Sequence, residues 1–381
     1  MQEESTTPVD WVALRKDFPT AENFCYLNLA NKAILPRIVE QSMQSWMKDI
    51  YENAGELAFS MGEIEKTREA VADLYGAPPE CISLIKNTSE GVNIVAQGFP
   101  WNEGDNVVIS EFEHENNTFP WRHLERRGIE IRMAKPGEDG RVTIDQYRDL
   151  IDSKTRILAV AWVVYGNGYR ADLKALSAFC HEQGIKIMVD GIQGVGILST
   201  PFSELGVDVL ISGGHKAQFS LAGAGFMYTT PEMTQMLMPP YAAKYSFNTL
   251  DRTVQAPELE TDAHRFEYGN PNFLGTWVQR RSAEYVKSIG LENIEARVCE
   301  LTTYLIEAAD KHQVQVRTPR PWAERAGIVS LDLGQHAGDA VNALKAQDII
   351  VAEKDGHLRT SMHFYNNEED IDRFMSALQA V

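Results

Sequence analysis

Two apolar runs of the chain end in ionisable residues that could do chemistry. Lys186–Val189 is followed by Asp190, and Val209–Ile211 is followed by Ser212–Lys216. Ligands of an open parallel sheet bind at the carboxyl ends of its strands, and the connection between these two ends is one crossover long. We therefore expect Asp190 and Lys216 to face one crevice. A lysine amine becomes a nucleophile only after it loses its proton, which burial promotes.

The neighbours of these two residues favour a chemical role over an ordinary one. Taken alone, Lys216 would be a solvated loop residue and Asp190 a helix N-cap. Gln193, Ser212 and His215 stand beside them in the sequence. The combination predicts a Schiff-base lysine with an acidic partner for a pyridinium nitrogen, the arrangement of pyridoxal phosphate enzymes.

A phosphate group needs a cradle, and the segment Asn87–Gly91 offers one. It follows the apolar run Ile82–Ile85 and opens a predicted helix, whose free N–H groups favour an anion. The hydroxyls of Thr88 and Ser89 add donors, although an ordinary N-cap is the alternative for this segment alone. The glycines after Asp190 do not match GxGxxG and no P-loop occurs, so nicotinamide and nucleoside triphosphate sites are not supported.

A histidine follows another predicted strand. His114 lies in the polar segment Glu111–Asn117, where its imidazole would stack on a cofactor ring or move protons. A loop histidine among carboxylates is the alternative. HExxH is absent, and His114 and His123 lack metal-site spacing with a third ligand, so we predict no metal site.

The composition restricts the class of partner. The 381 residues carry 36 Lys and Arg against 54 Asp and Glu, and the net charge of −18 disfavours nucleic acid and anionic membranes. No apolar stretch approaches the roughly 18 residues of a membrane span. The acidic start Met1–Glu4 does not match a signal peptide. Four scattered cysteines without metal-site spacing predict reduced thiols and a cytoplasmic location.

From about residue 80, short apolar runs alternate with amphipathic segments. The predicted strands are Ile82–Ile85, Asn106–Ser110, Ile129–Met133, Arg156–Val164, Lys186–Asp190 and Val207–Ser212. The predicted helices are Glu90–Gly98, Asn117–Arg127, Thr143–Ile151 and Leu173–Gln183. This alternation predicts an α/β fold with a mostly parallel sheet covered on both faces. Gly223–Tyr228 follows the last strand too closely for a helical crossover, so we expect it to be antiparallel.

A second unit is predicted to begin near residue 270. Pro239-Pro240 and the polar stretch 246–267 interrupt the alternation, and a long helical pattern then runs from about Trp277 to His312. The predicted elements after it are Gln313–Arg317, Ile328–Leu333, Gly338–Ala346, Ile349–Glu353, Leu358–Met362 and Glu368–Leu378. We predict an N-terminal segment and large domain over residues 1–270 and a smaller α/β domain over residues 271–381.

Four motifs together resemble a known family. They are Asn87–Asn93, Val189–Gln193, Ser212–Lys216, and Leu358–Ser361 with Tyr365-Asn366. From about Phe18 onward the chain resembles the class V aminotransferases of the fold type I pyridoxal phosphate enzymes. This group includes cysteine desulfurases, C–S lyases and isopenicillin N epimerase-like proteins. The resemblance implies a mostly parallel seven-stranded sheet in a large domain, a smaller C-terminal α/β domain, bound pyridoxal 5'-phosphate and a homodimer.

The resemblance also implies a role for each matching residue around the cofactor. Lys216 would carry the cofactor and move the proton at Cα, while Asp190 would keep the ring nitrogen protonated. Gln193 resembles the residue that hydrogen-bonds the ring hydroxyl, and His114 resembles a histidine that stacks on the ring. The residues that resemble phosphate ligands are Thr88, Ser212 and His215, the backbone N–H of Ser89, and Asn270 from a loop of the partner subunit.

On the substrate side, Arg359 would hold the α-carboxylate by a bidentate pair, which a lysine would not reproduce. The alternative for Arg359 is a surface arginine on an edge strand. Asn28, Tyr165 and Arg170 are further candidate substrate-binding residues, and Arg170 would bind a second acidic group. Structural roles in loops are equally compatible with Tyr165 and Arg170.

Two departures from the family pattern bear on the reaction. Cysteine desulfurases attack the substrate sulfur with a cysteine on a loop shortly before the carboxylate-binding arginine, and Ile349–His357 contains no cysteine. A persulfide mechanism is therefore not expected. Ala217-Gln218 follows Lys216 where an aromatic residue is common, so we expect a larger pocket or the Gln218 amide near the substrate.

The first predicted function is cleavage of a Cβ–X bond, such as a C–S bond, of a free amino acid through a Cα carbanion. An aminotransferase and an epimerase of the isopenicillin N epimerase kind are the alternatives, because these reactions differ in where a proton is returned. A cofactor-binding protein without activity is a further alternative, which the presence of Lys216, Asp190 and Arg359 disfavours.

Overall fold

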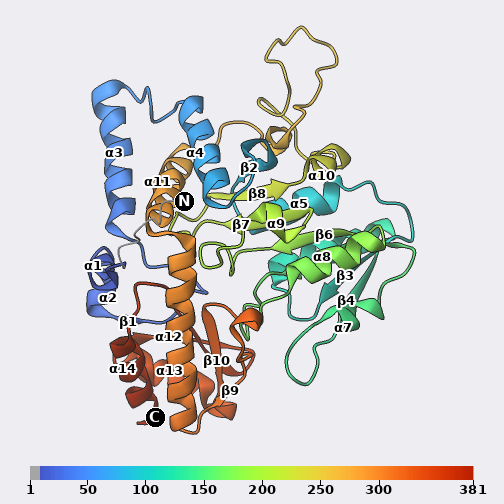
Figure 1. Cartoon of the computed structure of the whole chain (residues 1–381). Helices are drawn as coiled ribbons and strands as arrows, with labels where there is room; N and C mark the ends of the chain where they lie inside the picture. The colour runs from blue at the N-terminus through green and yellow to red at the C-terminus, as the bar shows by residue number, and fades with distance from the viewer. Residues whose placement is uncertain (1–8, 381) are drawn as a thin grey trace, which may run out of the picture.

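The computed structural model describes residues 9–380, and its centre is a seven-stranded sheet (Figure 1). In spatial order the strands are β2 (Ile82–Ile85), β8 (Gly225–Thr229), β7 (Val209–Gly213), β6 (Lys186–Asp190), β5 (Thr155–Ala161), β3 (Asn106–Ser110) and β4 (Glu130–Ala134). Strands β3 to β7 run parallel, and β8 lies antiparallel between β7 and β2. The predicted mostly parallel sheet and its antiparallel addition are confirmed.

Both faces of this sheet are buried, because its strands are apolar runs whose alternate residues point to opposite faces. In β3, Val108 packs in one core, and Val107 and Ile109 pack in the other. Helix α8 (Leu173–Glu182) contributes to the first core and α5 (Thr88–Gly98) to the second. With both faces covered, the carboxyl ends of the parallel strands remain as the open edge.

The predicted helix Asn117–Arg127 is wrong as one element. It is divided into η2 (Glu115–Asn117), α6 (Phe119–Arg122) and η3 (His123–Arg127). Pro120 explains the division, because it lies in the first turn of α6, where its missing N–H costs nothing. Further inside a helix, a proline would remove a backbone hydrogen bond and clash with the preceding turn, so α6 does not extend back to Asn117.

The long helical pattern Trp277–His312 is also two helices, α11 (Phe273–Ile289) and α12 (Leu291–Lys311). Gly290 separates them with a φ of 88°, a conformation that glycine adopts freely and other residues do not. The break lets α11 stay with the large sheet's helices while α12 continues into the C-terminal unit (Figure 1).

Helices that are far apart in the sequence pack together beside the large sheet. α11 lies beside α3 (Arg37–Asn53) and α4 (Met61–Leu74) (Figure 1). The remaining short helices are α1 (Trp11–Arg15), α2 (Thr20–Asn23), η1 (Pro79–Cys81), α7 (Ile144–Arg148), α9 (Phe202–Leu205), α10 (Pro231–Met236), η4 (Ala263–Phe266), η5 (Trp322–Glu324) and η6 (Gly334–His336). Among residues 9–380, no helix has the length and apolar character needed to cross a bilayer.

A second sheet forms the predicted C-terminal α/β unit. Its antiparallel strands lie in the order β12 (Ala352–Lys354), β13 (His357–Ser361), β10 (Ile328–Asp332) and β9 (Gln315–Val316). Side chains of α12, α13 (Ala337–Lys345) and α14 (Glu368–Leu378) share one apolar core with this sheet.

The N-terminal segment also reaches the C-terminal unit. β1 (Cys25–Tyr26) pairs in parallel with β11 (Ile349–Ile350), and Cys25 and Leu27 join the C-terminal core. The sequence prediction placed this segment with the large domain only. The domain boundary at residue 270 stays a prediction.

Gly91 allows helix α5 to approach the sheet closely. A Cβ at this position would lie 2.6 Å from Ile211 Cγ2 and 2.9 Å from Ile85 Cδ1. Both contacts are with buried core side chains, which have little room to move. The small residue therefore fixes the position of the helix whose first turn reaches the edge of the sheet.

We predict that Gly91→Ala lowers the free energy of unfolding by about 1–3 kcal/mol, because the added methyl group overpacks the core. Gly338→Ala is the matched control, since Gly338 is a helical glycine with open space around its Cβ position. The control is expected to gain up to about 1 kcal/mol from helix propensity. Urea denaturation measures both variants, and equal effects of the two would contradict the packing account.

Candidate active site

The carboxyl ends of the parallel strands open on a pocket that joins segments distant in sequence. Asp190 ends β6, Lys216 follows β7, and Arg359 comes from β13 of the C-terminal sheet. The predicted site residues that line this pocket are Thr88, His114, Tyr165, Asp190, Gln193, His215, Lys216 and Arg359. Also lining it are Ala30, Asn31, Asn87, Asn116, Ala161, Val163, Ile192 and Lys354.

Lys216 has the electrostatic setting of a nucleophilic amine. Desolvation lowers the pKa of its ammonium group to about 8, and the nearby carboxylate of Asp190 opposes part of this shift. About a tenth of the amine is therefore unprotonated at pH 7, and attack on a carbonyl carbon requires this form.

Asp190 is a buried carboxyl group that needs a cationic partner. Its Oδ1 accepts a hydrogen bond of 3.1 Å from the backbone N–H of Ile192. Burial raises the pKa of Asp190, while the Ile192 N–H and the charge of Lys216 lower it. A pyridinium N–H at this point would supply the missing positive partner.

The first turn of α5 carries an unused hydroxyl. Asn87 caps the helix by accepting a hydrogen bond from the Glu90 N–H, which leaves Thr88 beside the pocket. The Oγ1 of Thr88 is buried and has no hydrogen-bond partner in the described part of the chain. An unpaired buried hydroxyl at a helix N-terminus fits a bound phosphate.

Two other predicted phosphate ligands do not line the pocket. Ser89, which follows Thr88 in α5, is half-buried. Ser212 lies behind the pocket, where its Oγ accepts a hydrogen bond of 2.8 Å from the Gln218 amide. The same amide donates to the Gly213 carbonyl, so the expectation that Gln218 reaches the substrate is wrong: buried backbone and hydroxyl acceptors hold it.

The N-terminal segment closes one side of the pocket. Gln193 donates from Nε2 to the Ala30 carbonyl oxygen at 2.9 Å, which uses one of the two N–H donors of its amide. Asn28 lies just behind, pairing with Ser361, and it does not line the pocket. Its buried Oδ1 has no partner among the residues described.

In the described part of the chain, no carboxylate lies within 4.0 Å of the Arg359 guanidinium group. Its side chain is buried, and Nη1 donates to the Tyr165 carbonyl oxygen at 2.9 Å. The buried Nε has no partner in the described chain. Burial lowers the pKa of the guanidinium to about 10. These features fit a ligand carboxylate that would complete the ion pair.

His114 lies at the mouth of the pocket against Tyr165, with ring centroids 5.1 Å apart and an edge-on angle of 72°. Its Nδ1 accepts a hydrogen bond of 3.1 Å from the Asn116 backbone N–H. Burial lowers the pKa of His114, which favours the neutral ring. A neutral imidazole is suited to contact with a cofactor ring.

Arg170 is not brought to this pocket, contrary to the prediction. Its backbone pairs with Val163 in an antiparallel bridge, and its Nη1 lies 3.2 Å from Glu295 Oε1 in a separate cavity. Glu295 is held in place by hydrogen bonds from Ser199 and Trp322. The arginine therefore has a fixed intramolecular partner and no access to a substrate at Lys216.

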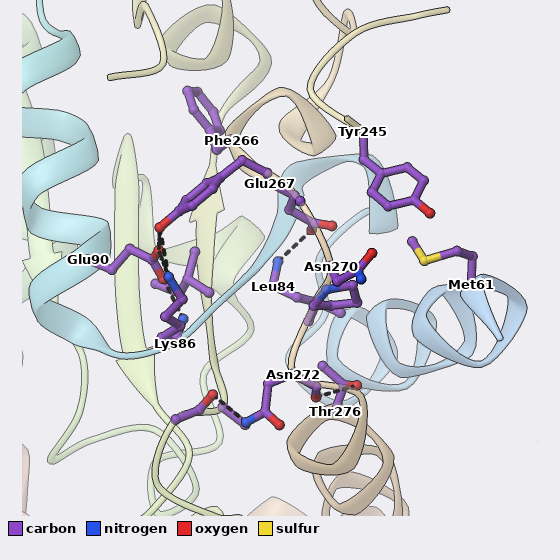
Figure 2. A pocket seen from close by; sticks show the side chains of 16 residues that line it. Met61, Leu84, Lys86, Glu90, Tyr245, Phe266, Glu267, Asn270, Asn272 and Thr276 are labelled. Atoms are coloured by element: carbon purple, nitrogen blue, oxygen red, sulfur yellow. Dashed lines mark hydrogen bonds and ion pairs between the residues drawn. The ribbon is translucent and has the colours of Figure 1, made fainter. Parts of the chain in front are cut away.

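Asn270 also lies away from Lys216 within its own chain. Figure 2 shows it in a second pocket, which Met61 and Tyr245 also line. Glu267 anchors this segment by accepting a 2.7 Å hydrogen bond from the Leu84 N–H and by pairing with Arg68. A role for Asn270 at a phosphate therefore requires a second copy of the chain.

Glu113 is a buried carboxyl group next to the site that the sequence prediction did not include. Its Oε1 accepts from the Ala161 N–H at 2.9 Å, and its Oε2 accepts from the Asn117 amide at 2.7 Å. Burial raises the pKa of Glu113 to about 7, and the charge of Asp190 adds to the rise. The residue ties the loop that carries His114 to the end of β5.

None of the four cysteines lines the pocket. Burial raises the pKa of Cys25 to about 12, of Cys81 to about 11 and of Cys180 to about 12. Cys299 lies half-buried on α12. Asp, Glu, His and Cys side chains form no group of three or more that could hold a metal ion within residues 9–380.

The chain belongs to the class V aminotransferase family: the family described as Aminotransferase class-V matches residues 25–374. It is 28% identical over 399 residues to a probable cysteine desulfurase of Methanothermobacter thermautotrophicus, with 97% of each chain covered. The apo structure of a cysteine desulfurase from Thermococcus onnurineus NA1 matches with a TM-score of 0.88, 25% identity and 97% coverage of each chain.

A complex of the cystine C–S lyase C-DES with its product cysteine persulfide matches with a TM-score of 0.88. At 21% identity, covering 95% of this chain and 98% of that one, it shows the shared fold. Class V aminotransferases are pyridoxal phosphate enzymes of fold type I. The predicted family, fold, enzyme class and cofactor are therefore confirmed.

We predict that Thr88→Val weakens binding of pyridoxal phosphate by about tenfold or more, because a charged phosphate loses a hydrogen-bond donor. The stability of the apo protein is expected to stay the same or rise, since the variant removes an unpaired buried hydroxyl. Fluorescence titration and urea denaturation measure the two effects. Thr88→Ser should keep wild-type affinity, and full affinity in Thr88→Val would remove the phosphate role.

We predict that Glu113 contributes stability to the apo protein that is lost as the pH rises from about 4.5 to about 7. The pKa of Glu113 is raised to about 7 in the folded state, so folding favours the protonated carboxyl and its contribution is lost above that pKa. Burial also lowers the pKa of His363 to about 3, which acts in the opposite direction, so the measurement is the difference between the wild type and Glu113→Gln. Between pH 5 and pH 7.5, urea denaturation should show that the wild type loses about 2 kcal/mol relative to Glu113→Gln. Identical pH slopes in the two proteins would exclude Glu113 as the cause.

Proposed function

We propose that this protein cleaves a Cβ–X bond, such as a C–S bond, of a free amino acid without an enzyme cysteine. One observation carries the proposal: Lys216, Asp190 and Arg359 converge in one pocket whose lining contains no thiol. Bound pyridoxal phosphate would withdraw electrons from Cα of an attached amino acid.

Under this proposal each residue of the pocket has a separate role in the reaction. Arg359 binds the α-carboxylate and so orients the amino acid. Asp190 holds the proton on the ring nitrogen. Lys216, whose amine has a lowered pKa, removes the proton from Cα and passes it to the group X, which leaves Cβ with the electrons of the broken bond. His114, which lines the same pocket, would contact the cofactor ring.

The absence of a thiol from the pocket favours direct loss of the leaving group from Cβ. The segment that carries the nucleophilic cysteine in desulfurases is here the hairpin β12–β13, with Asp355-Gly356 as its turn. Three thiols are buried in cores with raised pKa values, so they supply no thiolate. Under this proposal the substrate itself supplies the bond that breaks.

The experiment incubates the holoenzyme with cysteine, cystine and acidic amino acids without a keto acid acceptor. We predict that a keto acid and ammonia accumulate over many turnovers while the cofactor's visible absorption persists. Lys216→Ala should lose this activity, and Cys299→Ser should keep it. Stoichiometric formation of pyridoxamine phosphate would establish an aminotransferase instead, and inversion at Cα without a keto acid would establish an epimerase.

We also propose a homodimer, which the family resemblance implies. The separation of Asn270 from the Lys216 pocket within one chain supports a role for this residue in the site of a second copy. The cytoplasmic location stays a prediction.

A further inference from the structure

Lys354 lines the same pocket as Lys216 and Arg359, although it belongs to a different strand from either. It ends β12 and pairs with His357, the first residue of β13. Asp355 and Gly356 form the two-residue turn between them, with φ of 51° and 78°. Positive φ at both positions is the geometry of a type I′ hairpin, which fixes the strand ends rigidly.

The ammonium group of Lys354 has no carboxylate partner. Its Nζ lies 5.4 Å from the centroid of the Tyr165 ring, and no ion pair within 4.0 Å involves it in the described chain. Two carboxylates on neighbouring loops do not pair with Lys354: Glu115 lies 3.4 Å from His114 Nδ1, and Asp355 faces the backbone of Gly166. The backbone carbonyl oxygen of the same Tyr165 accepts a hydrogen bond from Arg359 Nη1. Lys354 and Arg359 therefore flank one residue.

The charges of the pocket leave Lys354 without a role in cofactor or α-carboxylate binding. Lys216, Lys354 and Arg359 are the Lys and Arg residues of the lining, and Asp190 is its one carboxylate. On the proposed function, Asp190 serves the ring nitrogen, Lys216 carries the cofactor and Arg359 takes the α-carboxylate. Lys354 is the remaining cation.

The position of Lys354 places it on the substrate side. It also lines an adjoining cavity, whereas Thr88 lines only the first pocket. The phosphate end and Lys354 therefore belong to different ends of the site. The charged residues of the adjoining cavity besides Lys354 are Arg317 and the carboxylates Glu138, Asp139 and Asp355. A substrate held at Arg359 would extend its side chain past Tyr165 to Lys354, at the boundary of this cavity, and the carboxylates beyond Lys354 would keep an anionic end from passing further.

We propose that Lys354 binds a second anionic group at the end of the substrate side chain. The substrate class is then α-amino acids whose side chains end in a carboxylate, sulfinate or sulfonate. The inference rests on the proposed function for the placement of the α-carboxylate at Arg359. It assigns to Lys354 the selectivity for a second acidic group that Arg170, paired with Glu295, does not supply.

The test compares binding of L-aspartate with L-asparagine, and of L-glutamate with L-glutamine, by the absorption change of the bound cofactor in the first seconds. The wild-type holoenzyme should bind each acid about tenfold to a hundredfold more tightly than its amide. A hydrogen bond between two charged groups stabilises a complex more than one to a neutral amide, and the difference corresponds to that ratio of dissociation constants. Lys354→Met should reduce this ratio to near one, and Lys354→Arg should preserve most of it. Lys345→Met, which removes an exposed lysine of α13, is the matched control and should keep the ratio.

An equal affinity for acid and amide in the wild type would overturn the inference. So would a ratio that survives in Lys354→Met, or a loss of affinity for acid and amide alike, which a structural role would produce. The proposed reaction and the proposed role of Lys354 are tested by different results. If Lys354 sets the ratio but only pyridoxamine phosphate forms, the lyase proposal is wrong and the inference stands. If a keto acid and ammonia form but Lys354 does not affect the ratio, the inference about Lys354 is wrong and the lyase proposal stands.

Discussion

The whole site depends on keeping the carboxyl group of Asp190 and the amine of Lys216 out of water at one edge of a sheet. Burial raises the pKa of the first and lowers that of the second, and each partly offsets the other's shift. Such groups are costly unless partners complete their interactions. Holding them in place therefore requires a rigid scaffold, which the parallel strands β6 and β7 provide from adjacent positions.

The rest of the architecture completes the enclosure around this pair. Helix α5 brings the free hydroxyl of Thr88 to one end, and close packing at Gly91 sets the distance of that helix from the sheet. The C-terminal sheet supplies Arg359 and Lys354 at the other end. The N-terminal segment lies between the two units, where Gln193 holds Ala30 and β1 pairs with β11.

Much of this arrangement follows from the sequence, because parallel strands bring their carboxyl ends together. That rule alone places Asp190 and Lys216 in one pocket, and both line it. The failures have local causes. Arg170 is separated from the site by an antiparallel bridge and by Glu295, which lies 125 residues away in sequence. Gln218 is captured by Ser212 through a contact that periodicity does not show.

Two features of the structure that we did not predict could have been predicted from the sequence. Gly290 interrupts the long helical pattern and marks the break between α11 and α12. Asp355-Gly356 is a strong hairpin signal, and it would have placed Lys354 beside Arg359. By contrast, the burial of Glu113 depends on Asn117 and on the backbone of β5, so its raised pKa emerges only from the folded chain.

The central claim is that Lys216 is the residue to which the cofactor attaches. The most direct measurement reduces the holoenzyme with sodium borohydride, digests it and identifies by mass spectrometry the lysine that carries the phosphopyridoxyl group. The account predicts that the label lies on Lys216. A label on Lys354, the other lysine of the pocket, or on any other lysine would contradict it.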